Sequence, residues 1–593
     1  MANWFSYVEV AAAALAGAAW YLFPELGAWP LALGLAPWVV RLAATGRAGR
    51  MTRFAPPLFL FLIMAVGGVW AAYDPAAAWA KFWLIVGAIL LFYAFAHGLL
   101  AAHADEGRSG EAYAWMLALM GATVTVYFLA THDWGQFTAE LAFVPELGRR
   151  LQAPLPPLPG HRLNPNVVGG LLAMSIPFAG LAFCLAWARR RWRRAAAAMA
   201  LLGLALFGLL MTTSLGAWLG LAAALVLAGV WTLAGWWVRP RRRRWLVLGA
   251  MVVVVLLAIG VALLRPEAVV AAAGPLPGTG GIGRLSMYRS ALPLVADYPF
   301  VGGGLNGFDM LYSTYAFLTH VGFIPHAHNV YLNVAIEQGL PALFALGWMW
   351  GLAVVAGWRD AADGRVRPLL GVGLLALVTM AVHGLVDDAF YGSRALLLLF
   401  VPLAFVLPFP SARAVDRKRW ASVVVATGVG LTLLAAVLLW RPLLSLAYGN
   451  LAAVQQSRAE LSVYEWPEWP IQDAVRREVD LSRPVANFER ALSLNPENGP
   501  AGRRLGQIEL SLGEYGAALE HLRRAYRQMP WDNGTRQLYG EALIVTGSVE
   551  EGATLWDGVW ATQGQLDGRV YWYRHIGDIE RLEAVQAAAE QAE

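Results

Sequence analysis

The sequence predicts an all-α protein, in which a polytopic membrane helix bundle of about 12–13 spans precedes a C-terminal extracytoplasmic helical-repeat domain. Three observations lead to this fold class. The 593 residues are 58% hydrophobic and only 14% charged. The apolar residues come in long blocks, and about 20 such residues cross a bilayer. The composition becomes polar and helix-patterned after residue 440. We therefore expect a membrane domain at 1–440 and a soluble domain at 441–593.

Thirteen apolar segments are candidate membrane spans, and the second of them is short. They are residues 7–23, 29–41, 56–73, 77–99, 113–131, 166–188, 195–213, 215–238, 245–264, 341–358, 368–386, 395–408 and 420–440. Arginine clusters such as 41–53, 189–194 and 239–244 fall on one side of the membrane if the N-terminus is cytoplasmic. Because Arg and Lys near span ends stay in the cytoplasm, the C-terminal domain is expected outside it.

The same arginine clusters account for the net charge of +5. Each cluster is short and stands between spans, so it indicates membrane topology and not nucleic-acid binding. The single cysteine, Cys184, lies in a predicted span, and no intramolecular disulfide can form. The first span lacks a basic leader, and we read it as an uncleaved helix.

Three segments longer than a turn are expected outside the cytoplasm: 132–165, 265–340 and everything after 441. The first is rich in proline and reads as an ordered loop, because it runs directly into a span. The second is too long for a passive connection. We expect this large loop, 265–340, to carry the functional site.

The C-terminal region contains an internal repeat. Phe488, Ala491 and Pro496 recur 34 residues later as Leu522, Ala525 and Pro530. A weaker copy follows at 540–560. This period and the small residues at matching positions are typical of tetratricopeptide-like repeats, which are paired helices with a concave binding surface. The alternative is a set of ordinary amphipathic helices.

Two glycine-rich stretches in the large loop, "GTGGIG" at 278–283 and "GGGLNG" at 302–307, match a dinucleotide-binding pattern only literally. Neither follows a strand of a βαβ unit, so we read both as turns. They flank a predicted helix at 284–296. On that helix Arg284 and Tyr288 share a face, whereas Arg289 points elsewhere. Arg284 is thus the better candidate to meet a ligand together with Tyr288.

His326, His328 and Asn329 directly precede an apolar helix. The residues near these histidines show no usual metal-ligand spacing, so we expect no metal ion and no cofactor. A guanidinium can hold phosphate oxygens, and a neutral imidazole can take a proton from a hydroxyl. Together they suit group transfer from a diphosphate to a hydroxyl. The alternative is that the two histidines only cap the helix or lie at the water interface.

Five stretches in order resemble the O-antigen ligase and polymerase superfamily of bacterial envelope glycan enzymes, and they cover about 164–408. They are "RLNPNVVGGLLAM", "TTSLGAWLG", "GRLSMYRSALPLVADYPFVGGGLNGF", "HAHNVYLNVAIEQGLPALF" and "HGLVDDAFYG". The resemblance implies a metal-independent glycosyltransferase in the bacterial inner membrane. Its donor would be an undecaprenyl-diphosphate-linked glycan, used on the extracytoplasmic face.

The resemblance also implies roles for individual residues. His328 matches the histidine proposed as catalytic base, and Arg284 matches an arginine proposed to hold the diphosphate. A second arginine of many relatives is replaced here by Leu215, and Arg162 is our candidate to supply that charge. The remaining residues expected to contact substrate are Tyr288, Arg289, His326 and Asn329.

The acceptor implied by the resemblance is a lipid, a glycan or a protein, and the motifs do not separate a ligase from a polymerase. The repeats would suit an acceptor protein or an assembly partner. Two other classes stay open: a polysaccharide transporter or flippase, and a non-enzymatic scaffold that displays the repeats. The few ionisable residues near the span ends, Lys81, His97 and His383, speak against a coupled transporter.

Overall fold

The computed structural model describes residues 2–22, 25, 27, 29–46, 51–102, 108–137, 141–154, 162–237, 284–319, 324–362, 368–407, 438–464, 471–559 and 566–592. This part of the chain is helical and contains no strand, as predicted. The predicted span 245–264 and all but the last three residues of the span 420–440 lie outside the described residues. The same holds for the first part of the large loop, 265–283.

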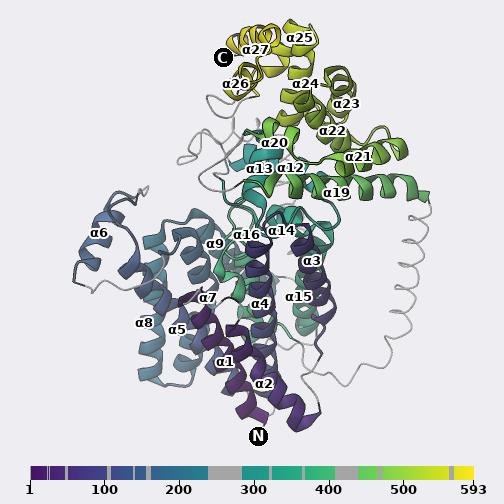
Figure 1. Ribbon diagram of the computed structural model, residues 1–593. Coiled ribbons are helices and arrows are strands. Elements are labelled where there is room, and N and C mark those ends of the chain that lie inside the picture. The colour runs from purple at the N-terminus through teal and green to yellow at the C-terminus, as the bar shows by residue number, and fades with distance from the viewer. Residues whose placement is uncertain are drawn as a thin grey trace.

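The membrane bundle is the lower part of the molecule in Figure 1. Its helices are α1 (Ala2–Leu22), α2 (Pro30–Thr45), α3 (Ala55–Ala71), α4 (Pro75–Ala102), α5 (Arg108–Thr131), α7 (Pro165–Ala188), α8 (Trp192–Thr212), α9 (Leu215–Trp237), α15 (Leu340–Ala362), α16 (Pro368–His383), η2 (Arg394–Leu398) and α17 (Val401–Phe405). Within the described residues, six helices are long and apolar enough to cross a membrane, and five shorter apolar helices accompany them. Each coincides with a predicted span, so the polytopic membrane fold is confirmed.

One predicted span differs in form. In the described part of the predicted span 395–408, the chain is not one continuous helix but a 3-10 turn, η2, followed by the five-residue helix α17. Phe405 of α17 packs against Phe95 of α4 and Phe178 of α7. The apolar run is therefore buried within the bundle.

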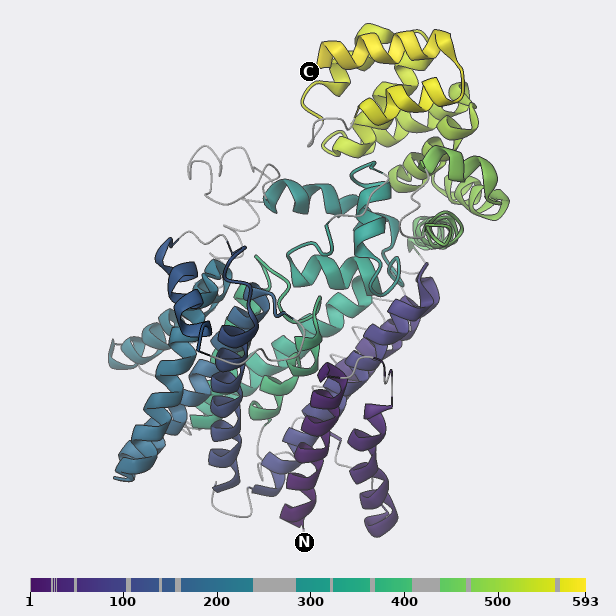
Figure 2. The ribbon, with the colours of Figure 1, turned by 60° about the vertical axis from the view of Figure 1, so that its left-hand side comes forward.

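The outer part of the chain lies at one end of the bundle, and the N-terminus lies at the other end (Figures 1 and 2). Three helices of the large loop come first: α12 (Arg284–Asp297), α13 (Phe308–Tyr315) and α14 (Val330–Gln338). The C-terminal helices follow beyond them: α19 (Trp440–Leu461), α20 (Gln472–Glu478), α21 (Ser482–Leu494), α22 (Gly499–Leu512), α23 (Tyr515–Gln528), α24 (Asn533–Val545), α25 (Val549–Trp556), α26 (Asp567–His575) and α27 (Ile579–Ala592). A short helix, α6 (Phe143–Gln152), lies in the segment 132–165.

Consecutive C-terminal helices pack in pairs, α22 with α23, α24 with α25 and α26 with α27. Small residues allow the close approach. A Cβ atom at Gly506 of α22 would lie 2.5 Å from Cγ of Leu522 in α23, and Ala518 and Ala525 of α23 are fully buried. This pairing is what the 34-residue period predicts, while the assignment to the tetratricopeptide family stays a prediction.

The large loop and the C-terminal helices share one apolar core. Met287 and Leu294 of α12 lie in the same buried cluster as Leu505 and Ile508 of α22. Asn450 of α19 adds polar contacts, because its side-chain oxygen accepts hydrogen bonds from the backbone nitrogens of Phe300 (3.1 Å) and Val301 (3.3 Å). The large loop therefore packs directly against α19 and α22 of the C-terminal region.

A buried ion pair lies at the centre of this shared core. Asp297, the last residue of α12, contacts Arg503 at 2.5 Å and Arg504 at 3.3 Å, and all three side chains are at most 1% exposed. Arg504 also donates to Gln456 at 2.7 Å and lies 3.4 Å from the ring centroid of Tyr315. Because Asp297 is the carboxylate that both guanidinium groups contact out of contact with water, the end of α12 is held on α22.

We predict that Asp297→Ala strongly destabilises the outer part of the protein. The substitution leaves two buried guanidinium groups without their carboxylate, and removing one partner of a buried pair costs about 3–5 kcal/mol. Unfolding of the purified protein in detergent measures the loss. The matched control is Glu520→Ala, because Glu520 pairs with Arg524 on the protein surface, where ion pairs contribute little. An Asp297→Ala variant that unfolds like the Glu520→Ala control would contradict this account.

Candidate functional site

The segment 384–393 after α16 lies against the start of α14. The backbone nitrogen of Val330 donates to the oxygen of Gly384 at 2.9 Å, and the side-chain nitrogen of Asn329 donates to the oxygen of Leu385 at 3.0 Å. On the other side, α7 comes close, since a Cβ at Gly170 would lie 2.7 Å from Cβ of Ala389. These contacts fix the segment that carries Asp387.

Asn329 is the N-cap of α14. Its side-chain oxygen accepts from the backbone nitrogens of Tyr331 (3.0 Å) and Leu332 (3.1 Å), which would otherwise lack partners at the helix start. The asparagine, and not the two histidines, therefore caps the helix. Both polar ends of its side chain are engaged within the protein.

His328 has a left-handed backbone conformation, with φ of 46°. Residues other than glycine adopt this region uncommonly, and such strain concentrates at functional sites. The hydroxyl of Tyr288 donates to the backbone oxygen of His328 at 2.7 Å. Burial raises the pKa of Tyr288, against the opposing charge of Arg284, so the hydroxyl keeps its proton and remains a donor. The tyrosine on α12 thereby fixes the histidine backbone.

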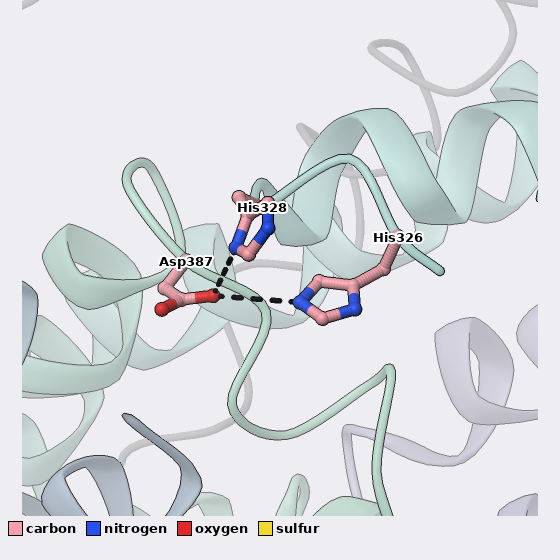
Figure 3. Close-up of side chains that lie close together, drawn as sticks. All are labelled: His326, His328 and Asp387. Carbon is pink, nitrogen blue, oxygen red and sulfur yellow. Dashed lines mark hydrogen bonds and ion pairs between the residues drawn. The ribbon is translucent and has the colours of Figure 1, made fainter. Parts of the chain in front are cut away.

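Asp387 joins His326, His328 and Arg284 in one cluster, and Figure 3 shows the carboxylate between the two histidines. Its Oδ1 atom lies 3.0 Å from Nδ1 of His328 and 3.7 Å from Nε2 of His326. Its Oδ2 atom lies 3.7 Å from a guanidinium nitrogen of Arg284. Burial alone would raise the pKa of Asp387, but the two imidazoles and the charge of Arg284 hold it well below its usual value. The carboxylate stays ionised at neutral pH.

In this cluster, only one of the two ring nitrogens of His328 contacts the carboxylate. Nδ1 faces the carboxylate, and within the described residues no hydrogen bond involves Nε2. The Asp387 side chain is 4% exposed, whereas that of His328 is 31% and that of Arg284 is 43% exposed. If Nδ1 carries the proton that Asp387 accepts, Nε2 is an acceptor that a ligand can reach. The arrangement suits proton abstraction beside a cation.

A second network of buried polar contacts holds α14 against its neighbours. Asn333 of α14 accepts from the backbone nitrogen of Ala327 at 2.9 Å and donates to Asp388. One turn further along α14, Glu337 pairs with Lys81 of α4 at 2.7 Å and accepts from the hydroxyl of Tyr391 at 3.0 Å. These contacts connect α14, α4 and the segment 384–393. They therefore hold both the turn with the two histidines and the segment with Asp387.

The structure brings four of the residues singled out in the sequence to this cluster: Arg284, Tyr288, His326 and His328. The other three are placed differently. Asn329 caps α14, and Arg289 makes no hydrogen bond or ion pair to any described residue. Arg162 pairs with Asp133 at 2.8 Å. Catalysis or substrate binding by each of the seven residues stays a prediction.

Asp387 is the residue that the reasoning from sequence missed. Its stretch, "HGLVDDAFYG", is one of the five motifs, but Asp387 lies outside the large loop, 59 residues beyond His328. The same is true of Asp388, which Asn333 reaches from α14. Two adjacent acidic residues at the end of an apolar segment were the available signal.

His326, His328 and Asp387 could also hold a metal ion, because their ligand atoms lie within 4.8 Å of one another. Two contacts weigh against that use. One carboxylate oxygen is already paired with Nδ1 of His328, and the other faces the positive charge of Arg284. A divalent cation would have to displace the first contact and accept the guanidinium as a neighbour.

Comparison with known proteins gives a family match for part of the chain. Residues 200–347 match the family model described as O-antigen ligase. The matched segment includes Arg284, His326 and His328 and ends before Asp387. The match supports the O-antigen ligase family for this chain. Neither the comparison with curated proteins nor that with solved structures gives a match.

We predict that the purified protein holds no tightly bound divalent metal ion, because Arg284 and the His328–Asp387 contact occupy the carboxylate. Elemental analysis of the protein, and its melting temperature with and without EDTA, measure this. His328→Ala is the matched control, since it removes one of the three ligands. One equivalent of zinc or manganese that the control lacks, together with a lower melting temperature in EDTA, would contradict the prediction.

Proposed function

We propose that this chain is an envelope glycan ligase or polymerase. It transfers a glycan from an undecaprenyl-diphosphate donor to a hydroxyl of a lipid, glycan or protein acceptor, without a metal ion. One observation carries the proposal: His328 is oriented by a buried carboxylate through Nδ1, next to an exposed arginine. The match of residues 200–347 to the O-antigen ligase family supports the same conclusion.

In this proposal Nε2 of His328 takes the proton of the acceptor hydroxyl. The hydroxyl oxygen then bonds to the anomeric carbon of the donor, and the bond from that carbon to the diphosphate oxygen breaks. The imidazolium that forms lies 3.0 Å from the Asp387 carboxylate. Because the charges are opposite and the carboxylate is buried, this contact stabilises the protonated histidine and favours proton transfer.

Arg284 is the proposed holder of the diphosphate. It lies at 3.7 Å from Oδ2 of Asp387, so the carboxylate steadies it without engaging all five guanidinium donors. A guanidinium can clamp two phosphate oxygens at once, and its charge compensates the leaving group as the glycosyl bond breaks. Tyr288, one turn along α12, fixes the histidine next to it.

We further propose that the protein lies in a bacterial inner membrane, with its N-terminus cytoplasmic and its C-terminal domain outside. The arginine-rich loops support this orientation. So does the position of the N-terminus at the end of the bundle opposite to the C-terminal helices (Figure 2). The site then faces the extracytoplasmic side, where the proposed donor is used.

The repeats are proposed to receive an acceptor protein or an assembly partner. Arg503 and Arg504 of α22 are paired with Asp297 of the large loop, so this part of α22 is not available to a partner. The later helices, α23 to α27, lie farther from the bundle (Figure 1). A partner bound to them would be held beyond the site, which suits delivery of an acceptor to it.

We predict that His328→Ala lowers turnover by about 10²- to 10⁴-fold, the usual contribution of a general base. Donor binding should stay close to wild type, because the imidazole acts on the acceptor. Turnover and donor binding of variants purified into nanodiscs measure the two effects. His326→Ala is the matched control with a milder expected loss, since His326 lies farther from Asp387. Near-normal turnover of His328→Ala would show that another group is the base.

Arg284→Ala should weaken donor binding as well as turnover, because a charged contact to phosphate acts before and during the reaction. Arg284→Lys should restore only part of both, since an ammonium keeps the charge but not the paired geometry of the guanidinium. Arg289→Ala, on another face of α12, should lose less. Binding of the lipid-linked donor to each variant is the measurement. Unchanged donor affinity in Arg284→Ala would remove this arginine from the diphosphate site.

A further inference from the structure

A hollow lined by arginines lies at the end of the membrane bundle away from the histidine cluster. Its lining includes Glu111 and Trp115 of α5 and, around the turn from α7 to α8, Arg189, Arg191, Arg193 and Arg194. Near the start of α7, Gly170 contacts the segment that carries Asp387. Because a helix rises about 1.5 Å per residue, Arg189 lies about 28 Å farther along α7. The hollow is therefore separate from the proposed catalytic site.

A tight turn between α7 and α8 gathers these arginines. The backbone nitrogen of Arg191 donates to the oxygen of Ala186 at 2.9 Å. Arg190 takes a left-handed backbone conformation with φ of 56°. Arg193 and Arg194 follow in the first turn of α8, which begins at residue 192. The chain reversal thus brings the arginines of the hollow together on one short segment.

Most of the positive charge in the hollow is uncompensated. Arg189 pairs with Glu111, whereas the side chains of Arg191, Arg193 and Arg194 make no hydrogen bond or ion pair to any described residue. All three are exposed. Residues 103–111 and 189–194, which contain the two neighbouring helix connections, together hold six arginines and three acidic residues. The net charge of this end of the bundle is therefore positive.

The start of α8 adds to the positive potential of the hollow. Arg191 is the N-cap of this helix and makes no side-chain cap hydrogen bond, and the first turn contains no acidic residue. The first backbone N–H groups of a helix lack partners, and the helix dipole is positive there. Arginines in this turn are unfavourable unless an anion lies against them. A phosphate suits the position, because guanidinium and backbone N–H groups both donate to its oxygens.

Tryptophans place the hollow at the level of lipid headgroups. Trp187 at the end of α7 and Trp192 at the start of α8 are each 56% exposed. Their rings pack edge to face with centroids 4.8 Å apart, and Trp115 lines the hollow itself. Tryptophan is enriched where a bilayer meets water. The phosphate groups of phospholipids lie at that depth, so the bilayer is the source of the anion.

We propose that this hollow binds the headgroup of an anionic phospholipid, with its phosphate against Arg191, Arg193 and Arg194. In the orientation proposed above, the lipid belongs to the cytoplasmic leaflet, where basic pockets between membrane helices bind such headgroups. The lipid joins α5 to the turn between α7 and α8, because Glu111 and Trp115 belong to the same wall. The arginine tract thus binds lipid in addition to setting the topology.

Native mass spectrometry of the full-length protein in mild detergent tests the proposal. The wild type should retain phosphatidylglycerol in preference to phosphatidylcholine, which has one phosphate but no net charge. The triple variant Arg191→Gln/Arg193→Gln/Arg194→Gln should bind phosphatidylglycerol at least about tenfold more weakly, because each basic residue near a headgroup contributes. The matched control makes the same change in net charge on α23 of the C-terminal region: Arg523→Gln/Arg524→Gln/Arg527→Gln.

A second pair of variants changes one charge within the same turn. Arg193→Gln should weaken retention of phosphatidylglycerol by about fivefold. Arg190→Gln is its control, since Arg190 does not line the hollow. The melting temperature of each variant without lipid shows that it is folded, and this pair decides the question if the triple variant is not. Phosphatidylglycerol should raise the melting temperature of the wild type more than that of Arg193→Gln.

Loss of phosphatidylglycerol in the hollow variants, with retention in both controls, supports the proposal. Equal retention of phosphatidylcholine by the wild type, or unchanged retention in the folded hollow variants, overturns it. An equal loss in the α23 control also overturns it, because net charge alone would then explain binding. Inorganic pyrophosphate is the probe for a soluble anion, and stabilisation by it equal to that by phosphatidylglycerol overturns the lipid as the occupant. None of these outcomes depends on turnover, so the test is independent of the proposed function.

Discussion

The site depends on one buried carboxylate. Asp387 meets α12 through Arg284, the turn before α14 through His326 and His328, and its own segment after α16. These parts are far apart in the chain, and none of them alone orients an imidazole. The low pKa of Asp387 means that the carboxylate keeps its charge across the physiological pH range. The charge that fixes Nδ1 of His328 is also the charge that would stabilise the imidazolium during proton transfer.

A second buried carboxylate, Asp297, holds the helix α12 that contributes Arg284 to this site. Asp297 ends the helix that begins with Arg284, and Arg503 and Arg504 hold it on α22. The C-terminal helices therefore determine where α12 lies, and through α12 they affect the position of Tyr288 against His328. This coupling explains why the large loop and the repeats share a core. C-terminal helices that only tethered a partner would not need buried ion pairs to the loop.

Much of the fold could be predicted from the sequence, because membrane spans and paired helices have local signals. The blocks of apolar residues located the spans, and the spacing of Arg284 and Tyr288 placed both on one helix face. The resemblance to a family led to His328 and Arg284. The adjacent acidic residues after α16 marked the position of Asp387, but its pairing with His328 had no local signal, since the two residues meet across 59 positions. The break between η2 and α17 had no signal in the apolar run, because composition does not report where a helix changes its geometry.

The most direct test of this account is a double-mutant cycle between His328 and Asp387. Turnover is measured for His328→Ala, Asp387→Ala and the double variant in nanodiscs, with melting temperatures to show that each is folded. If Asp387 acts through His328, the double variant should be no slower than His328→Ala alone, because residues that act as a unit give non-additive losses. Losses that multiply in the double variant would show that the two residues act independently, and the oriented-histidine account would be wrong.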